Sequence, residues 1–400
     1  MIARLKKLLT IAVPAALAAA LVAALAIEVW VRIAWDESRG TPGFFLTDAA
    51  RGQRLAPGYD GWFAGVPVRI NSLGFRDRRD YALEKPPNTL RILVLGDSVT
   101  FGHGTLDDTT YPYLLEQRLR RWRPDVNWEV WNLGVPGYNT RQELVYLNEI
   151  GPRAQPDVVV VGFFKNDFEG GNAAQPPPSS LRRAGASALG FLQRHVYSYE
   201  FYKRVALTAR WRLLTSEADR LRIEHLGTER QLLERSGSIA DAPEQRLTDY
   251  DDLNDPAAID FVCARGAVQG APIATTVAAL VRRRAPELGD WFKTVDEFQA
   301  LHREGRYRIV FFVNMAPAAC GVDRFADGGH LADEAALLEV LGRDAHAVSS
   351  LRQFFQHRPS QMPAADDHAI GNSNAVKADV LFRYLRDHVL PALLPATVKP

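Results

Sequence analysis

Residues 94–102 read VLGDSVTFG, in which an apolar segment ends on Gly96, Asp97 and Ser98. The apolar residues Ile92–Leu95 are typical of a buried strand. A serine that follows such a strand in an α/β protein lies at the carboxyl edge of the sheet, where these proteins place their sites. Ser98 could simply cap a helix, or it could act as a nucleophile. A nucleophile needs a base within hydrogen-bond reach and an acid that orients the base.

Strand and helix patterns alternate along the chain after Ser98. Further strands are predicted at Trp128–Asn132 and Asp157–Phe164, and the second of these, DVVVVGFF, has the continuous apolar run of a central parallel strand. Helices are predicted at Tyr113–Trp122, from its one apolar face, and from Thr140 to about Asn148, where Thr140 and Glu143 form a capping box. This alternation predicts a doubly wound α/β fold around a parallel sheet.

The alternation stops at Gly170 and resumes with a helix at Trp291–Arg303 and a strand at Tyr307–Met315. A final helix at Asn374–Leu390 has one apolar stripe that would face the core. The chain between the two halves, 171–290, begins with a Pro/Gly-rich loop and later becomes acidic and irregular through Asp255. It is predicted to be an insertion, with helices near Phe191–Leu214 and Ser216–Glu234.

A base for Ser98 is sought among nine histidines. His368 is the one histidine that follows two consecutive carboxylates, Asp366 and Asp367, and it lies just ahead of the final helix. A surface histidine is the alternative for any of the nine, but the position of His368 favours a catalytic base, which a neighbouring carboxylate would orient.

Two further residues could stabilise an oxyanion. Gly137 lies in the stretch NLGVPGYNT just before a capped helix, and Asn166 ends the strand that is expected to neighbour the strand of Ser98. Backbone N–H groups in glycine turns and side-chain amides serve this role well because they are fixed before the charge develops. Each residue could also serve only its turn.

Together these four segments resemble the SGNH hydrolases, also called the GDSL family, over about 89–170 and 305–392. The resemblance implies a three-layer α/β/α fold and an esterase or lipase activity. It implies that Ser98 is the nucleophile, that His368 is the base, and that the oxyanion hole consists of the N–H groups of Ser98 and Gly137 with the Asn166 side chain. It implies no metal or organic cofactor.

The chain departs from the family pattern at two places. Phe164 stands where the family has a glycine two residues before the asparagine. Ala365 stands where the usual D-x-x-H pattern has its acid, so Asp366 or Asp367 must orient the imidazole, and Asp366 is favoured because one residue separates it from His368. The change is expected to weaken catalysis without abolishing it.

The N-terminus predicts a membrane anchor. Arg4, Lys6 and Lys7 precede an uncharged run from Leu8 to Ile27, long enough to span a hydrocarbon core of roughly 30 Å. The basic residues favour a cytoplasmic N-terminus. A cleaved signal peptide, with a small-x-small site at Ala24–Ala26, is the alternative. Both readings predict export, and the composition favours a single-pass protein of a bacterial inner membrane whose main domain faces the periplasm.

Charge and cysteine content indicate whether the chain is expected to bind nucleic acid, form a disulfide or hold a structural zinc ion. The chain has 48 Lys and Arg against 47 Asp and Glu, a net charge of +1, which does not favour nucleic-acid binding. Cys263 and Cys320 are its two cysteines. They could form a disulfide in an oxidising compartment or remain separate thiols. Without a CxxC or Cys/His cluster, a structural zinc site is not expected.

These observations predict five segments. They are an anchor (1–35), a stalk that docks beside the site (36–88), the first core half (89–170), an insertion that could act as a lid (171–290), and the second core half (291–395).

Two shorter motifs each allow two interpretations. The segment Asn71–Asp77 resembles one found in membrane-anchored members of the family, where Arg76 could meet a substrate acid or form a structural salt bridge. The basic and aromatic stretch His195–Arg212 could contact lipid, or it could be a helix packed on the core.

The predicted function is ester hydrolysis through an acyl-enzyme, removing an O-acetyl or other short acyl group from an envelope or exported polysaccharide. An O-acyltransferase that uses the same residues is one alternative. The other is a non-catalytic polysaccharide-assembly protein that retains the fold.

Overall fold

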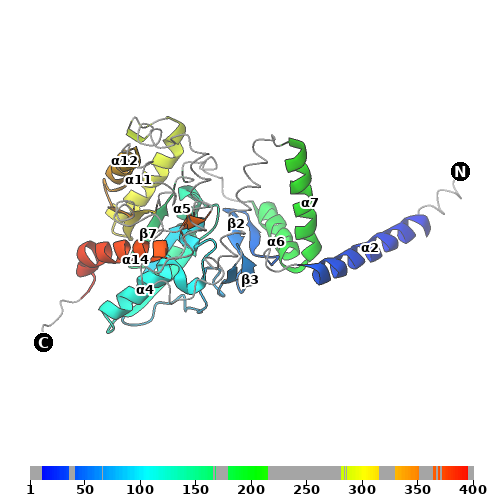
Figure 1. Cartoon of the computed structure of the whole chain (residues 1–400), viewed down its shortest axis with the longest axis horizontal. Coiled ribbons are helices and arrows are strands. Elements are labelled where there is room, and N and C mark those ends of the chain that lie inside the picture. The colour runs from blue at the N-terminus through cyan, green and yellow to red at the C-terminus, as the bar shows by residue number, and fades with distance from the viewer. Residues whose placement is uncertain are drawn as a thin grey trace, which may run out of the picture.

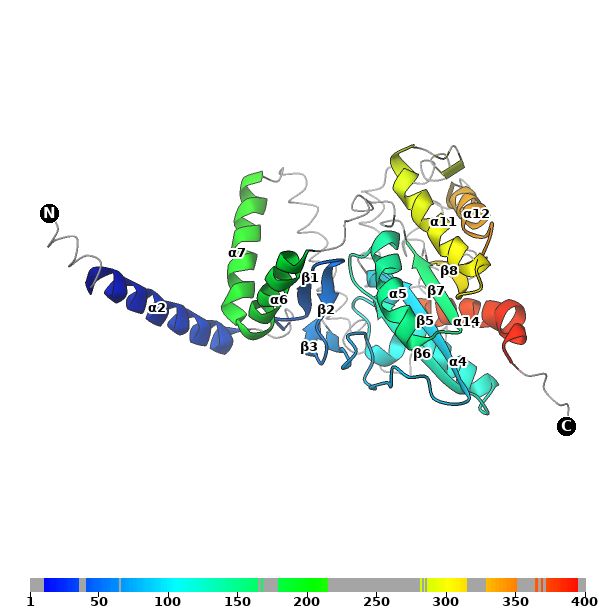
Figure 2. The same cartoon turned by 180° about the vertical axis from the view of Figure 1, so that it is seen from behind.

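The centre of the computed structural model is a five-stranded parallel sheet with the strand order β6-β5-β7-β8-β9 (Figures 1 and 2). The structure describes residues 11–35, 41–64, 66–164, 167, 179–214, 281, 282, 284, 286–314, 329–350, 364, 365, 368, 369 and 372–394. The helix predicted at Ser216–Glu234 and the pairing of Cys263 and Cys320 lie outside these residues.

The strands follow the apolar runs of the sequence. They are β5 (Thr89–Gly96), β6 (Asn127–Gly134), β7 (Val158–Phe163), β8 (Arg308–Val313) and β9 (His346–Ser349). All six residues of β7 are buried, as expected for a parallel strand that is covered on both faces.

Helices cover both faces of the sheet, which confirms the three-layer α/β/α fold. The side chains of Leu93 and Val159 belong to a core shared with α5 (Thr140–Ala154), α11 (Gly289–Arg303) and α12 (Gly329–Leu341). The alternate residues Ile92 and Val160 point to the other face, where they pack against α4 (Tyr111–Trp122) and α14 (Asn372–Tyr384). The alternation follows from the two-residue period of a strand.

The segment before the sheet contains more strand than predicted. The sequence predicts one short strand there, Val66–Ile70, which Pro67 restricts to a sheet edge. The structure has two antiparallel hairpins, β1 (Phe45–Asp48) with β2 (Gly52–Leu55), and β3 (Asp60–Phe63) with β4 (Val66–Arg69). Pro67 is tolerated because each hairpin has only two strands, so β4 has a free edge. Their apolar side chains join the core on the α5 side: Phe44, Leu46, Leu55, Val66, Val68 and Ile70.

Some helix boundaries differ from the prediction. Helix α5 is capped by Asn139 and Gln142, one residue before the expected pair of Thr140 and Glu143, because Asn is an equally good N-cap. The helix expected at Phe191–Leu214 is two helices, α6 (Ser180–His195) and α7 (Tyr197–Leu214), since the backbone of Val196 is extended. The final helix lies where predicted and continues as a wider turn over Leu385–Val389.

The first described helix, α2 (Val13–Ala34), extends away from the sheet and meets α7 near its C-terminal end (Figure 1). It has a mean hydropathy of 2.0 and its most apolar window is 0% buried. Its length and composition make it a candidate membrane span.

Candidate active site

Ser98 opens a short helix, α3 (Ser98–Phe101), immediately after β5. The Oδ1 atom of the buried Asp97 accepts a hydrogen bond from the Val99 N–H at 2.8 Å, so Asp97 is the cap of this helix and Ser98 is not. The Ser98 side chain is half-buried at the carboxyl edge of the sheet, which is where the sequence predicted it.

A row of three glycines forms the floor under this turn. Gly96 of β5 is in register with Gly134 of β6 and with Gly162 of β7. A Cβ atom at Gly134 would lie 2.3 Å from the Phe101 backbone nitrogen, and one at Gly162 would lie 2.5 Å from Thr100 Oγ1. The turn that carries Ser98 can therefore rest directly on the sheet only because these positions have no side chain.

Arg76 holds the loop that follows Ser98. Its buried guanidinium donates hydrogen bonds to Asp107 at 2.9 Å and to the carbonyl oxygens of Phe101, Gly102 and Thr105. These partners satisfy the donors of the guanidinium. The structural salt bridge was thus the right alternative for Arg76, although the backbone carbonyls contribute more bonds than the acid does.

The structure brings His368 to Ser98. His368 lies on β11 (His368–Ala369), which pairs with β10 (Ala364–Ala365) in a small antiparallel hairpin. The His368 Nε2 atom is 2.7 Å from Ser98 Oγ, a distance at which the hydroxyl can donate to a neutral imidazole. Asp366 and Asp367, the two candidate acids, lie outside the described residues.

A second imidazole supports the first. The His103 ring stacks on the His368 ring with a centroid separation of 4.5 Å and an interplanar angle of 26°. The His103 ring also packs at an interplanar angle of 87° to Phe63, with the two ring centroids 5.4 Å apart. His103 is not among the residues that the sequence singled out, although its position five residues after Ser98, in the same loop, was a signal that could have pointed to it.

Gly137 lies in a turn that is tied to the strand of Ser98. The Val135 N–H donates to the Gly96 carbonyl at 2.9 Å, and the Tyr138 N–H donates to the Val135 carbonyl at 3.0 Å. Gly137 has a φ of +82°, which the third position of a type II turn requires. Asn166, the third predicted donor to the oxyanion, lies outside the described residues.

Buried ionisable groups surround the base of this site. Asp167 accepts hydrogen bonds from the Phe164 N–H at 2.6 Å and from Thr140 Oγ1 at 2.9 Å. Burial, and then the neighbouring Asp167 and Asp97, raise the pKa of Glu143 well above its ordinary value. Burial lowers the pKa of Lys377 on α14 to about 7, while Asp97 opposes the change. These groups lie out of contact with water beneath Ser98, so their charged forms are costly there.

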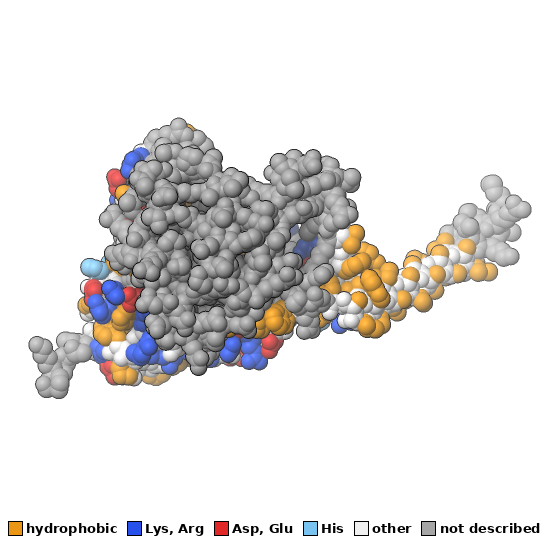
Figure 3. Space-filling view, in the orientation of Figure 1, with side chains coloured by type: hydrophobic (Ala, Val, Ile, Leu, Met, Phe, Trp, Pro, Cys, Tyr) orange, Lys and Arg blue, Asp and Glu red, His pale blue; other side chains and the backbone are white. Residues whose placement is uncertain are grey.

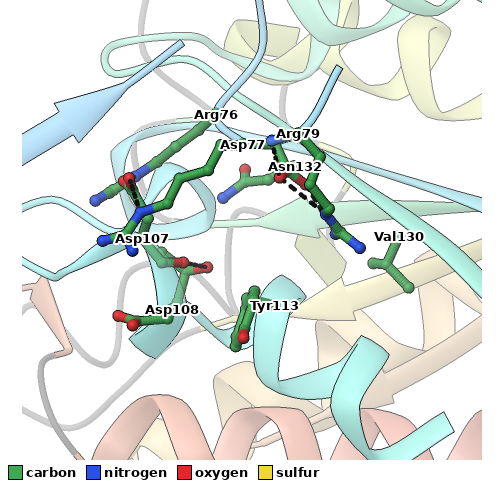
Figure 4. A pocket seen from close by; sticks show the side chains of 10 residues that line it. Arg76, Asp77, Arg79, Asp107, Asp108, Tyr113, Val130 and Asn132 are labelled. Carbon is green, nitrogen blue, oxygen red and sulfur yellow. Dashed lines mark hydrogen bonds and ion pairs between the residues drawn. The ribbon is translucent and has the colours of Figure 1, made fainter. Parts of the chain in front are cut away.

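A separate cavity of about 220 Å³ lies beside the Arg76 loop (Figure 4). Arg76 and Arg79 line it from one segment, and Asp107 and Tyr113 line it from another. Arg79 is paired with Glu116 at 2.6 Å and with Asp77 at 3.0 Å. Neither Ser98 nor His368 lines this cavity. In the described part of the chain, no cluster of three His, Cys, Asp or Glu side chains could hold a metal ion.

Residues 94–223 match the sequence model of the GDSL-like lipase/acylhydrolase family. The match begins four residues before Ser98 and includes Gly137 and Asn166. A search of curated proteins gave no match.

Several solved structures resemble the chain at low identity. A two-domain esterase active on acetylated mannans is 12% identical, with 74% of this chain covering 49% of that one at a TM-score of 0.32, so this chain spans about half its length. The acetylxylan esterase Axe2 from Geobacillus stearothermophilus is also 12% identical, with coverages of 74% and 93% and a TM-score of 0.34. A GDSL-like lipase from Bacteroides thetaiotaomicron is 10% identical, with coverages of 75% and 89% and a TM-score of 0.30.

Proposed function

We propose that the chain is an esterase of the GDSL type, whose family model residues 94–223 match, and that it hydrolyses esters with Ser98 as nucleophile and His368 as general base. The observation that carries this proposal is the distance of 2.7 Å between Ser98 Oγ and His368 Nε2, across 270 residues of sequence. A serine and an imidazole at this distance form the activated pair that acyl transfer requires.

The reaction would run in two halves. Ser98 Oγ attacks the acyl carbonyl carbon while its proton passes to His368 Nε2, and the tetrahedral intermediate collapses as His368 returns that proton to the departing alcohol. Water then attacks the acyl-enzyme, giving its proton to His368, and the carboxylic acid leaves as Ser98 regains its hydrogen. The N–H groups of Ser98 and Gly137 and the Asn166 amide are the proposed donors to the oxyanion.

Asp366 is the proposed partner of the His368 Nδ1 atom, with Asp367 as the alternative. Both residues lie between the paired positions Ala365 and His368. The short connection keeps either carboxylate within two residues of the imidazole.

We propose a short acyl group, with acetyl as the first choice, on a polysaccharide of the cell envelope. The half-buried position of Ser98 and the His103 ring beside the base favour a small acyl group. The candidate span α2 favours a site held at a membrane, where envelope polysaccharides are assembled. The proposed location is the periplasmic side of a bacterial inner membrane.

The test uses the full chain in detergent micelles, because α2 contacts α7 and its removal would expose that contact. Initial rates are measured with p-nitrophenyl acetate, butyrate and octanoate. We expect the acetate to be cleaved fastest, and Ser98→Ala and His368→Ala each to lower kcat by about 10⁴-fold or more. Equal rates for the wild type and Ser98→Ala would refute the proposed nucleophile.

A second experiment distinguishes hydrolysis from acyl transfer. An acetylated oligosaccharide is incubated with the chain, and its mass is followed with and without an unacetylated acceptor glycan. Release of free acetate supports hydrolysis. Acetyl appearing on the acceptor in place of free acetate would refute it in favour of the transferase. Asp366→Asn and Asp367→Asn, assayed side by side, identify the acid by the larger loss of kcat.

A further inference from the structure

Helix α6 is amphipathic, and its apolar side faces away from the protein. Leu181, Phe191 and Leu192 are 82%, 64% and 44% exposed. These residues fall on one side of a helix with 3.6 residues per turn, together with the exposed Ala184 and Ala188. We call these five residues the outer stripe. A surface helix of a soluble domain normally turns such a stripe toward the core.

The opposite side of α6 is the one that packs on the domain. Gln193 is buried, and its side-chain oxygen accepts a hydrogen bond from the Thr47 N–H of β1 at 2.8 Å. Gly190 lies over Leu46 on the same strand. A polar side chain and a glycine thus fix the orientation of the helix, and this leaves the outer stripe uncovered.

The charged residues of α6 are all basic. Arg182, Arg183 and Arg194 are exposed outside the outer stripe, and α6 contains no Asp or Glu. Arg194 donates a hydrogen bond to the Pro57 carbonyl at 3.0 Å. An apolar stripe on a helix whose charges are all basic is the pattern of a helix that lies in the interface of a membrane with anionic lipid headgroups.

The turn between α6 and α7 is fastened to the end of the candidate span. Glu28 of α2 accepts hydrogen bonds from the N–H groups of Tyr197 and Ser198 at 3.0 and 2.8 Å. Arg32 donates to the His195 carbonyl at 2.7 Å. Glu28 is the first acidic residue after the uncharged run of α2, so this contact lies at the level where the span would leave the hydrocarbon.

Aromatic side chains gather at the same level. The ring of Trp30 packs edge-on against Phe201 at 5.8 Å, and the ring of Trp35 does so against Tyr197 at the same distance. Trp and Tyr concentrate where a membrane protein crosses the headgroup region. Figure 3 shows hydrophobic side chains covering α2 as far as its junction with the rest of the molecule, and Tyr202 and Val205 of α7 are exposed beside it.

We propose that the outer stripe of α6, with Tyr202 and Val205 of α7, is a bilayer-binding surface that lies on a membrane containing anionic phospholipid. The stripe would enter the interface by roughly 5–10 Å, and Arg182 and Arg183 would meet the lipid phosphates. The α6–α7 pair and α2 together hold the domain at a fixed height and orientation above the membrane, which a single flexible anchor could not do.

The test measures the depth of single positions in the full chain, with one copy per lipid nanodisc of phosphatidylcholine and phosphatidylglycerol. In a background with Cys263→Ser and Cys320→Ser, an NBD fluorophore is attached to Leu181→Cys or Phe191→Cys. The matched control is Ser187→Cys, which is exposed on the same helix outside the stripe. Leu17→Cys on α2 marks the hydrocarbon. Quenchers are a lipid with a nitroxide high on its acyl chain, and aqueous iodide.

We expect the lipid nitroxide to quench the probes at positions 181 and 191 and iodide to leave them bright, with the reverse at position 187. Stripe probes that behave like the probe at position 187, while the probe at position 17 is protected, would overturn the proposal. Discs that hold two copies of the chain are measured in parallel. If the stripe probes are protected from iodide only in those discs, and the lipid nitroxide does not quench them, then the stripe binds a second copy of the chain and not the bilayer.

The role of anionic lipid is tested in a separate set of measurements. In discs of phosphatidylcholine alone, and in the double variant Arg182→Gln/Arg183→Gln, the stripe probes should become more accessible to iodide. No change in either case would overturn the role of lipid charge. The whole experiment can be repeated with Ser98→Ala, since the surface does not depend on the proposed chemistry.

Discussion

The two halves of the Ser98–His368 pair are held in different ways. Ser98 sits on a floor of three strands, capped by Asp97 and followed by a loop that the Arg76 guanidinium fastens at four points. His368 lies on a hairpin of two short strands outside the central sheet and stacks on the His103 ring. The turn of Ser98 is therefore part of the core of the fold, whereas His368 is presented by a small separate hairpin. Changes near Ser98 should cost stability and activity together, and changes near His368 should cost activity alone.

The largest expected effect is that of Arg76→Met. This change leaves Asp107 and the carbonyls of Phe101, Gly102 and Thr105 without their buried donor, which should cost about 3–5 kcal/mol of unfolding free energy. Arg78→Met is the matched control, because Arg78 also contacts Asp107 but is 57% exposed, and a surface pair contributes about 0–1 kcal/mol. Denaturant unfolding measures both variants. Equal losses would contradict the distinction between the two arginines.

Next in size is Gly134→Ala. The added methyl group would meet the backbone of Phe101 at 2.3 Å, and overpacking of this kind costs about 1–3 kcal/mol. Since the turn must move, kcat with p-nitrophenyl acetate should fall as well. Gly289→Ala is the matched control, because Gly289, like Gly134, has no positive φ, and nothing lies within 4 Å of a Cβ there. It should change neither the unfolding free energy nor kcat appreciably. Unchanged kcat in Gly134→Ala would show that the floor does not position Ser98.

The third prediction concerns the contact between His103 and His368. An aromatic stack of this kind contributes about 0.5–1.5 kcal/mol, so His103→Ala should lower kcat by about two- to tenfold with little change in unfolding free energy. His103→Phe keeps a stacking ring and should restore most of the rate, with the pH profile of kcat/KM unchanged. If His103→Phe is as slow as His103→Ala, then His103 acts through its nitrogens and not through the stack.

The last prediction is a pH dependence of stability from Lys377, which is small over any single pH unit. Its folded pKa of about 7 is lower than the ordinary 10.5 because the ammonium is buried. Between these two values the unfolded lysine keeps a proton that the folded one has lost. Stability therefore rises with pH in this window, by at most about 1.4 kcal/mol per pH unit. Lys377→Met should remove this rise. Denaturant midpoints of both proteins from pH 7 to 9.5 measure it, and parallel curves would contradict a buried neutral lysine.

Much of the fold could be predicted from local pattern. A parallel strand covered on both faces must be apolar along its whole length, so β5, β7 and β8 stand out in the sequence. Strands β1, β2 and β3 were not predicted because each has only four residues, too few to establish a period. The break at Val196 was missed because nothing in its side chain distinguishes an extended residue from a helical one.

The sequence singled out both Ser98 and His368, which the structure places 2.7 Å apart, because a serine after an apolar strand and a histidine after two acids are local signals. The glycine floor was not predicted, although Gly96, Gly134 and Gly162 each lie at or near the end of a predicted strand. Their shared role depends on register, and register is a property of paired strands. His103 and the Arg76 contacts likewise join segments that are distant in sequence.

By itself, the sequence determined the parallel α/β sheet, the family and the identity of the two residues that approach each other. Hydrophobic period and short motifs carry that information along the chain. Only the tertiary structure decided that Ser98 rests on three glycines, that His103 braces His368, and that α6 turns its apolar side outward. These features are contacts between segments, and which face of a helix is buried depends on the partner that the fold brings to it.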